Sequence, residues 1–357
     1  MPLGGRSASL AEVLDVWTRE AAEELTERLG GADLRCYACG HRCLVREGKR
    51  GICKVRFNEG GRLLAPSGYV AALACDPTEK KPFFHLLPGS DTLTFGMLGC
   101  DLHCAYCQNF ITSQALRDEA AGVAPRRVSS ESLIRSAREC GARVVGSSYN
   151  EPLITAEWAV EVFRKAKGAG FRTAFISNGN ATPQVLDYLR PVTDCYKIDL
   201  KSMSDRAYRQ LGGVVGNILD TVRMVHERGF WEEVVTLVVP GFNDSEGELR
   251  SAADFLASVS PDIPWHLTAF HRDYRMTENA NTTAAQLVRA CEIGRAAGLK
   301  FVYAGNLPGR VGRWENTYCP ACGELLVERY GYRIRQSKLG ADGLCPACCE
   351  KIPGVWG

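Results

Sequence analysis

The sequence lacks an excess of either charge, a long apolar run, and any repeat or low-complexity tract. Its 357 residues include 43 Lys and Arg against 41 Asp and Glu, which gives a formal net charge of +2. A protein that binds nucleic acid mainly through phosphates usually carries a basic excess or stripe, so this class of function is disfavoured. No run of about 18 apolar residues occurs, which excludes a membrane-spanning helix.

The N-terminus also lacks the apolar segment of a secretory signal, and it carries acidic residues early, at Glu12, Asp15 and Glu20. We therefore expect a cytoplasmic protein in a reducing compartment. Disulfides rarely persist there, so cysteines are more often metal ligands, catalytic thiols or small buried hydrophobes. The chain has 16 cysteines, so which of these roles they take bears directly on function.

Eleven of the 16 cysteines fall into three tight clusters, which favours metal binding. The other five are scattered along the chain. Because free cysteine is commonly buried, we predict that these five are packing residues. They are Cys75, Cys140, Cys195, Cys291 and Cys349.

An amphipathic helix is predicted over residues 9–29, where apolar residues recur at three- and four-residue spacings. The stripe consists of Leu10, Val13, Leu14, Trp17, Ala21 and Leu25. Its polar face is rich in Glu rather than in Lys or Arg, so we expect packing on the protein's own body rather than docking on a membrane.

From residue 91 to about residue 304, strand-like and helix-like segments alternate. The predicted strands are 93–98, 143–149, 172–177, 195–200, 232–239, 265–270 and 300–304. The predicted helices are 130–140, 155–169, 182–190, a stretch within 204–228, 244–259 and 283–297. Such alternation predicts an α/β fold with a parallel sheet, here a partial or near-complete (βα)6-7 barrel with its active site at the carboxyl ends of the strands. A doubly wound open sheet is the alternative.

Three regions follow from this pattern. Residues 1–90 hold the N-terminal helix and a four-Cys metal-binding segment, and residues 91–314 form the barrel. Residues 315–357 form a zinc-ribbon-like segment with a hairpin over 325–335.

The C-terminal cluster is a pair of Cys-Pro-Ala-Cys knuckles. Its members are Cys319, Cys322, Cys345 and Cys348. Two knuckles on a hairpin close a tetrahedral site of four sulfurs, and a closed site has a structural role. Zinc is the expected metal, and a rubredoxin-like iron is the alternative.

The N-terminal cluster also offers four thiolates, at Cys36, Cys39, Cys43 and Cys53. Structural zinc is our first interpretation. An auxiliary iron–sulfur cluster is the alternative, because cuboidal clusters also take four cysteines. His41 lies inside this loop, either as a replacement ligand or as a hydrogen-bonding residue.

The central cluster has only three ligands close together, Cys100, Cys104 and Cys107. A [4Fe–4S] cluster held by three thiolates keeps one iron open for a chelating ligand. The position directly after the first barrel strand is where a barrel carries out its chemistry. A zinc knuckle with a distant fourth ligand is the alternative.

Residues 99–109 resemble the signature of radical S-adenosylmethionine (SAM) enzymes, in particular the branch with glycyl-radical-enzyme activases such as pyruvate formate-lyase activating enzyme. Several segments together also resemble the radical SAM member of the AmmeMemoRadiSam system. These segments are 36–53, 76–82, 149–152, 240–244, 270–274 and 319–356. The resemblance spans nearly the whole chain from about residue 30.

The resemblance implies positions for the SAM contacts. Asn150 and Glu151 match the family element that binds the SAM amino group, although the glycines of that element are replaced. Asp199 and Lys201 match an Asp-Leu-Lys motif, in which the lysine pairs with the SAM carboxylate. The structural alternatives are a carboxylate at a helix N-terminus for Glu151 and a buried ion pair for Asp199 and Lys201.

The resemblance implies three further contacts. Ser177 and Asn178 match a Thr-Asn-Gly turn, but Ile176 replaces the carboxylate that helps to hold a cation in the activases. Tyr106 corresponds to a residue that packs against adenine. His271 corresponds to a histidine that contacts SAM, whereas His266 is expected to point away or pack.

The implied function is reductive cleavage of SAM to a 5′-deoxyadenosyl radical that abstracts hydrogen, with a protein or peptide as the expected substrate. A small-molecule substrate is the first alternative, and a non-catalytic zinc-binding interaction protein is an alternative of another class. The implied cofactors are a [4Fe–4S] cluster, SAM and zinc at two structural sites. The implied partners are a flavodoxin- or ferredoxin-type electron donor and Memo-like and AMMECR-type proteins, without membrane or nucleic acid.

Overall fold

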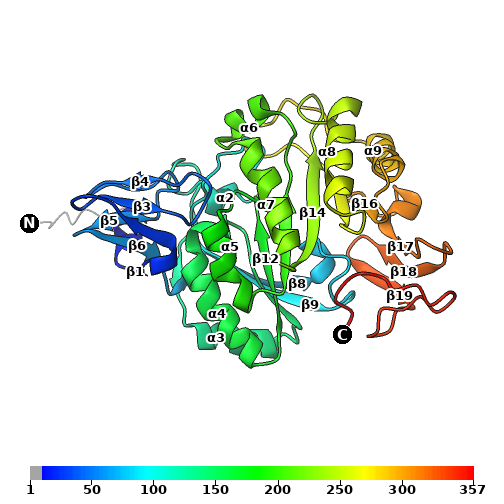
Figure 1. The fold of residues 1–357 in the computed structure, drawn as a ribbon, viewed down its shortest axis with the longest axis horizontal. Helices are drawn as coiled ribbons and strands as arrows, with labels where there is room; N and C mark the ends of the chain where they lie inside the picture. Colours follow the sequence, from blue (N-terminus) through cyan, green and yellow to red (C-terminus); the bar gives the residue numbers. More distant parts are fainter. Residues whose placement is uncertain (1–9) are drawn as a thin grey trace, which may run out of the picture.

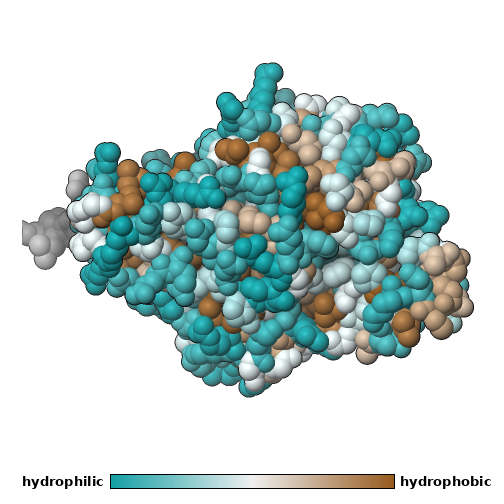
Figure 2. All heavy atoms as spheres, viewed as in Figure 1, coloured by the Kyte–Doolittle hydropathy of each residue, from teal (hydrophilic) through white to brown (hydrophobic). Residues whose placement is uncertain are grey.

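The computed structural model describes residues 10–357. The N-terminal strands gather at one end of the long axis, and strands β17, β18 and β19 lie at the other end (Figure 1). Between them lies a large sheet covered by helices. Figure 2 shows a mostly hydrophilic face with apolar residues in small groups. None of the helices within residues 10–357 is both long and apolar enough to cross a membrane.

The prediction of one helix over residues 9–29 is wrong for most of that range, and Ser9 lies outside the described residues. Helix α1 covers only Leu10–Asp15. It is followed by β1 (Thr18–Glu20), the 3-10 helix η1 (Glu23–Leu25) and β2 (Thr26–Arg28). Strand β1 pairs with β6 in an antiparallel ladder, so long-range strand pairing overrides the local helical periodicity.

Two small antiparallel sheets form the N-terminal lobe. One has the order β1-β6-β5 and the other the order β2-β3-β4. The bounds of the remaining strands are Leu34–Cys36 (β3), Leu44–Val45 (β4), Phe57–Glu59 (β5) and Arg62–Pro66 (β6). A further two-stranded pair joins β7 (Tyr69–Val70) to β10 (Arg126–Arg127).

Within residues 10–357, the central sheet has eight strands in the order β16-β15-β14-β13-β12-β11-β9-β8. All neighbours are parallel except β8, which runs antiparallel to β9. The strands are β8 (Ala72–Pro77), β9 (Asp91–Gly96), β11 (Val144–Ser147), β12 (Arg172–Ser177), β13 (Cys195–Asp199), β14 (Trp231–Val238), β15 (Trp265–Ala269) and β16 (Val302–Gly305). The carboxyl ends of the seven parallel strands therefore meet at one edge.

Helices alternate with these strands largely as predicted. They are α2 (Phe110–Ser113), α3 (Ser130–Glu139), α4 (Ala156–Gly168), α5 (Pro183–Leu189), α6 (Asp205–Leu211), α7 (Val215–Glu227), α8 (Glu246–Val259) and α9 (Ala284–Ala296), with 3-10 turns η2 (Thr78–Lys80), η3 (Pro152–Thr155), η4 (Arg190–Val192) and η5 (Gly312–Glu315). The exceptions are that the short helix α2 was not predicted and that the stretch within 204–228 forms two helices, α6 and α7. Thr283 begins α9 with a capping box that includes Gln286. Ser129 and Ser245 cap α3 and α8 through their hydroxyls.

The two faces of the sheet differ in polarity. On β13, Tyr196 and Ile198 belong to the main apolar core under the helices. Lys197 and Asp199, the alternate residues of the same strand, line an internal cavity. The alternation of the strand thus separates the core that stabilises the fold from the cavity that holds the candidate site.

The C-terminal segment adds β17 (Thr317–Tyr318) and the predicted hairpin, formed by β18 (Leu325–Tyr330) and β19 (Arg333–Ser337). These strands have a core of their own, which includes Phe301 and Tyr303 from the end of the parallel sheet. Burial of that shared core attaches the segment to the sheet.

The packing prediction for the five scattered cysteines is only partly right. Cys195 and Cys291 are buried as predicted. Cys75 and Cys140 instead form a disulfide, and Cys349 is exposed. The disulfide joins edge strand β8 to the C-terminal end of α3 across 65 residues of sequence, so their proximity depends on the tertiary structure.

Candidate functional site

A cavity of about 390 Å³ lies at the carboxyl ends of the parallel strands and contains most of the predicted site residues. It is lined by all three central cysteines. It is also lined by six of the eight predicted SAM contacts, namely Asn150, Glu151, Ser177, Asn178, Asp199 and Lys201. Its volume lies within the range of about 300–1,000 Å³ typical of small-molecule sites.

The loop after β9 positions the three central cysteines. Cys104 is buried, Cys100 and Cys107 are half-buried, and all three are free thiols. Gly99 has a φ of 92°, and a Cβ at this position would lie 2.8 Å from Val55. Glycine is therefore required for the turn into the loop. Leu102 N donates to Cys100 Sγ at 3.3 Å.

The sulfurs of Cys100, Cys104 and Cys107 are too widely spaced to surround a single ion. Among the described residues, only the four C-terminal cysteines bring three or more metal-binding atoms within 4.8 Å of one another. A [4Fe–4S] cluster binds each thiolate at a different iron, so it requires a wider spacing than one ion does. Three free thiols that line a cavity with an open side fit such a cluster.

Asp101 lies beside the first cysteine and was not singled out by the sequence pattern. Its carboxylate is buried and accepts from Asn178 Nδ2 at 2.7 Å and from Asn180 Nδ2 at 2.8 Å. Its backbone oxygen lies 3.2 Å from His41 Nε2. Asp101 therefore joins the central cysteine loop to β12 and to the N-terminal lobe. An acid directly after a cysteine gives no sequence signal for this role, because its burial depends on distant segments.

Glu151 is almost fully buried beneath the cavity. Its Oε1 accepts from Ser177 Oγ at 2.8 Å and from Leu153 N at 3.0 Å, and its Oε2 accepts from Asn178 N at 2.7 Å. Burial, followed by the nearby charge of Asp101, raises the pKa of Glu151 to about 8, although these hydrogen bonds act in the opposite direction. The carboxyl group is thus oriented by three donors, and a cationic ligand group beside it would favour its charged form and lower this pKa.

Two lysines share the carboxylate of Asp199. Lys201 Nζ donates to Asp199 Oδ2 at 3.2 Å, and Lys197 Nζ pairs with Oδ1. Burial acts to raise the pKa of Asp199, but the two lysines outweigh it and lower that pKa to about 2. Two positive charges against one negative charge leave this part of the cavity suited to an anionic ligand group.

Lys197 is a residue that the sequence analysis missed. It is buried and lines the cavity. Residues 197, 199 and 201 lie two apart, and side chains two apart on a strand point to the same face. Because Lys197 lies two residues before Asp199 on a predicted strand, its position could have identified it as a residue of the same face.

The structure separates Tyr106 and His271 from the other predicted contacts. Tyr106 is buried against Phe242, with ring centroids 5.7 Å apart, and does not line the cavity. His271 is exposed, and its Nε2 lies 3.0 Å from the side-chain nitrogen of Gln108, which does line the cavity. His266 packs between aromatic rings as expected, but it also lines the cavity.

The loop after β8 supplies cavity residues from a segment that the sequence analysis named as part of the resemblance but did not assign to the site. Lys81 Nζ donates to Asp76 Oδ2 at 2.8 Å and to the Tyr149 hydroxyl at 3.1 Å. Tyr149 has a φ of 67°, which is uncommon for a residue with a side chain. Lys80 also lines the cavity and donates to Asp76. These contacts close one wall of the site.

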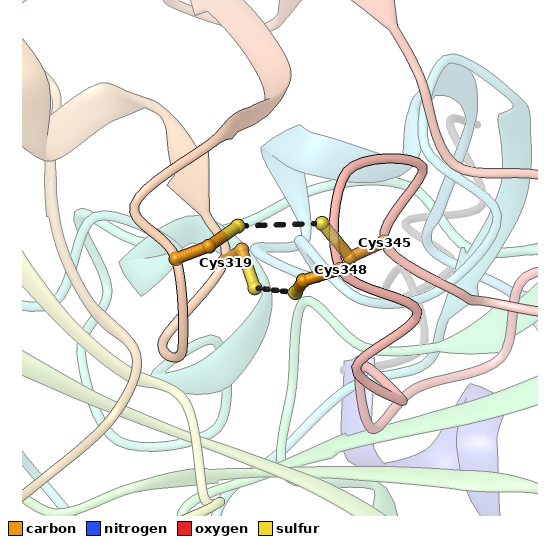
Figure 3. Close-up of side chains that lie close together, drawn as sticks. Cys319, Cys345 and Cys348 are labelled. Carbon is orange, nitrogen blue, oxygen red and sulfur yellow. Dashed lines mark hydrogen bonds between the residues drawn. The ribbon is translucent and has the colours of Figure 1, made fainter.

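The C-terminal cysteines converge as predicted (Figure 3). The sulfurs of Cys319 and Cys348 are 3.6 Å apart, and those of Cys322 and Cys345 are 3.7 Å apart. Four thiolates at about 2.3 Å from one zinc ion would be about 3.8 Å apart, so the spacing fits a single tetrahedral ion.

The N-terminal cysteines are arranged differently. Cys36, Cys39 and Cys53 are buried, Cys43 is half-buried, and all four are free thiols. No three of them lie within 4.8 Å of one another, although they belong to the described residues in which such groups were sought. His41 turns toward Asp101, with its Nε2 near the backbone oxygen of that residue.

Comparison with known proteins identifies relatives over most of the chain. The family model of the Radical SAM superfamily matches residues 95–256. An uncharacterized protein of Methanocaldococcus jannaschii is 34% identical over 329 residues, covering 91% of this chain and 97% of the relative. The pyruvate formate-lyase 1-activating enzyme of Escherichia coli is 26% identical over 205 residues, covering 54% of this chain and 80% of that enzyme.

Among solved structures, this chain is similar to a domain of a pyruvate-formate lyase-activating enzyme from Bacteroides vulgatus. The TM-score is 0.41 and the sequence identity 22%, covering 45% of this chain and 98% of that domain. It is also similar to a radical SAM methyltransferase from Sphaerobacter thermophilus, with a TM-score of 0.46, 19% identity, and coverage of 67% of this chain and 71% of the other.

Proposed function

We propose that this chain is a member of the radical SAM superfamily, whose family model matches residues 95–256, and that it cleaves SAM reductively to abstract hydrogen from a protein or peptide. Membership implies SAM and a [4Fe–4S] cluster as cofactors. When bound, the cluster would supply the single electron that cleaves SAM to methionine and the hydrogen-abstracting 5′-deoxyadenosyl radical. The open eight-stranded sheet corresponds, in this proposal, to a partial (βα) barrel.

One observation carries the proposal: three free cysteines and six candidate SAM contacts line a single cavity at the carboxyl ends of the parallel strands. These residues come from β9, β11, β12 and β13 and the loops after them. In barrel enzymes, the chemistry is located at this edge of the sheet.

The chain's own side chains would bind and orient SAM. Cys100, Cys104 and Cys107 would hold the cluster. Glu151, fixed by three hydrogen-bond donors, would accept from the amino group. Lys201 would pair with the carboxylate while Lys197 continues to neutralise Asp199.

The protein or peptide substrate is supported by the activating-enzyme relatives. Besides the enzyme of Escherichia coli, an isethionate sulfite-lyase activating enzyme of Oleidesulfovibrio alaskensis is 28% identical over 128 residues, which covers 35% of this chain. Enzymes with such names act on other proteins. A flavodoxin- or ferredoxin-type donor would then supply the electron, and Memo-like and AMMECR-type proteins are the proposed partners.

The test is SAM cleavage by protein that has been purified anaerobically, reconstituted with iron and sulfide, and reduced with dithionite. We expect 5′-deoxyadenosine and methionine in equal amounts. The variant Cys107→Ala should lose this activity, whereas Cys349→Ser, which changes an exposed cysteine outside the cavity, should keep it. Equal product formation by the Cys107→Ala variant would contradict the proposed role of the central cysteines.

A further inference from the structure

The four N-terminal cysteines form a separate group that does not line the cavity of the proposed SAM site. Cys36 ends strand β3, Cys39 and Cys43 lie in the following loop, and Cys53 lies in the next turn. All four are free thiols. Three of them belong to the buried apolar interior, so their grouping is not a surface feature.

The spacing of the sulfurs distinguishes two kinds of metal site in this chain. The C-terminal cysteines have the short separations that one tetrahedral ion imposes, 3.6 and 3.7 Å. The three central cysteines lie outside that short range, and their family position implies a [4Fe–4S] cluster. The N-terminal four also lie outside it. The N-terminal spacing therefore does not match that of one tetrahedral ion, whereas a [4Fe–4S] cluster binds each of four thiolates at a different iron.

Hydrogen-bond donors surround these sulfurs. Ile52 N donates to Cys43 Sγ at 3.5 Å. The backbone amides of His41 and Val55 donate to the sulfurs of Cys39 and Cys53. Backbone N–H groups of this kind stabilise the negative charge of an iron–sulfur site.

Arg56 carries a buried donor that the described side chains and backbone leave without an acceptor. Its side chain is buried, and its terminal nitrogens are occupied by Glu157 and the Ile154 carbonyl. Within residues 10–357, its Nε has no hydrogen-bond partner. Arg56 follows Cys53 by three residues, and its carbonyl oxygen accepts from the amide of Gly51, where an added Cβ would lie 3.7 Å from Cys43 Sγ, so its backbone lies close to the cysteine group. A buried N–H without a partner is unfavourable, and a cluster sulfide or thiolate would supply an acceptor.

The cysteine loop also lies against the central site. Gly40 N donates to the Asn180 carbonyl at 2.7 Å, and the Asn180 side chain donates to Asp101 at 2.8 Å. A Cβ on Gly99 would lie 3.1 Å from the Cys53 carbonyl oxygen. The two cysteine loops are thus in direct contact.

We propose that Cys36, Cys39, Cys43 and Cys53 bind a second [4Fe–4S] cluster, with Arg56 Nε as a donor to it. This site replaces the structural zinc that the spacing of the sequence favoured. All four irons would have a protein ligand, so the cluster would be a one-electron centre that does not bind SAM.

The test uses the full chain without the central cysteines, Cys100→Ala/Cys104→Ala/Cys107→Ala, reconstituted anaerobically. We expect about four irons and four sulfides per chain to remain, since a [4Fe–4S] cluster has that composition. Reduction should give an electron paramagnetic resonance signal that SAM does not change. Adding Cys39→Ser/Cys53→Ser should remove the iron and the signal, whereas adding Cys349→Ser should leave both.

A zinc ion in place of this iron, lost with Cys39→Ser/Cys53→Ser, would overturn the proposal, as would a chain without metal at this position. If the triple variant does not fold, Mössbauer spectroscopy of the wild-type chain measures how many irons lie in clusters. We expect about eight irons per chain, from two [4Fe–4S] clusters. A count of about four would overturn the proposal. Because the readout is metal content in a chain that cannot cleave SAM, its failure is distinguishable from failure of the proposed function.

Discussion

Arg56 and Glu157 form a bidentate ion pair that is almost completely excluded from solvent. Both distances between their terminal nitrogens and oxygens are 2.8 Å, and their side chains are 1% and 2% exposed. Arg56 precedes β5 of the N-terminal lobe, whereas Glu157 lies in the first turn of α4. The pair thus ties the cysteine-rich lobe to the parallel sheet.

Breaking this pair should destabilise the protein strongly. Arg56→Met leaves Glu157 as a buried charge without a partner, and we expect the free energy of unfolding to fall by about 3–5 kcal/mol. Arg56→Met/Glu157→Leu removes both charges and should recover much of this loss. Anaerobic urea titrations of the three proteins measure the effect. A double variant as unstable as the single one would show that the lost charge pairing is not the cause.

Lys201 should contribute to SAM affinity through its charge. A hydrogen bond to a charged group contributes about 1.5–3 kcal/mol, so Lys201→Met should weaken SAM binding by about 10- to 150-fold. Lys165→Met, which removes a half-exposed lysine paired with Glu131, is the matched control and should bind SAM normally. Equilibrium binding to the reconstituted protein is the measurement. An unchanged dissociation constant for SAM in Lys201→Met would mean that another cation pairs with the SAM carboxylate.

His85 should make stability depend on pH. It is fully buried, with its Nδ1 2.7 Å from the Pro353 carbonyl oxygen and its Nε2 2.6 Å from the Tyr303 hydroxyl. Burial lowers the pKa of His85 to about 4, and the nearby Glu233 only partly opposes this. The neutral ring fits both contacts, donating to the carbonyl and accepting from the hydroxyl.

Between pH 6.5 and pH 4 the unfolded chain therefore binds more protons at His85 than the folded chain does, so acidification destabilises the fold. The expected contribution is a loss of about 2 kcal/mol from pH 7 to pH 5. Unfolding titrations at several pH values measure the change in the free energy of unfolding. In His85→Gln, the loss between pH 7 and pH 5 should be smaller by about 2 kcal/mol. If the free energy of unfolding depended on pH equally in the wild-type protein and in His85→Gln, groups other than His85 would cause that dependence.

The C-terminal cysteines should bind one zinc ion independently of the iron sites. Cys322→Ser removes one of four ligands, so we expect about one zinc fewer per chain, unchanged iron, and faster proteolysis of the C-terminal segment. Cys349→Ser, adjacent to Cys348 but outside the group of four, should retain the metal. Elemental analysis by mass spectrometry distinguishes zinc from a rubredoxin-like iron. Unaltered metal content in Cys322→Ser would contradict the site.

Patterns between near neighbours in the sequence determined much of this protein. Apolar runs and turn residues predicted the strands and most helices from residue 130 to residue 305, because their periodicity reflects which face of an element is buried, but α6 and α7 were predicted as a single helical stretch. The spacing of Cys319, Cys322, Cys345 and Cys348 predicted their convergence, because each knuckle is a local turn.

The tertiary structure alone decided what depends on contacts between distant segments. Strand β1 forms because β6 is available to pair with it, and Cys75 meets Cys140 because β8 lies at the sheet edge. Asp101 links two cysteine loops only because His41 and Asn180 are folded against it. Local periodicity carries no information about such partners, since their approach depends on the free energy of the whole packed chain.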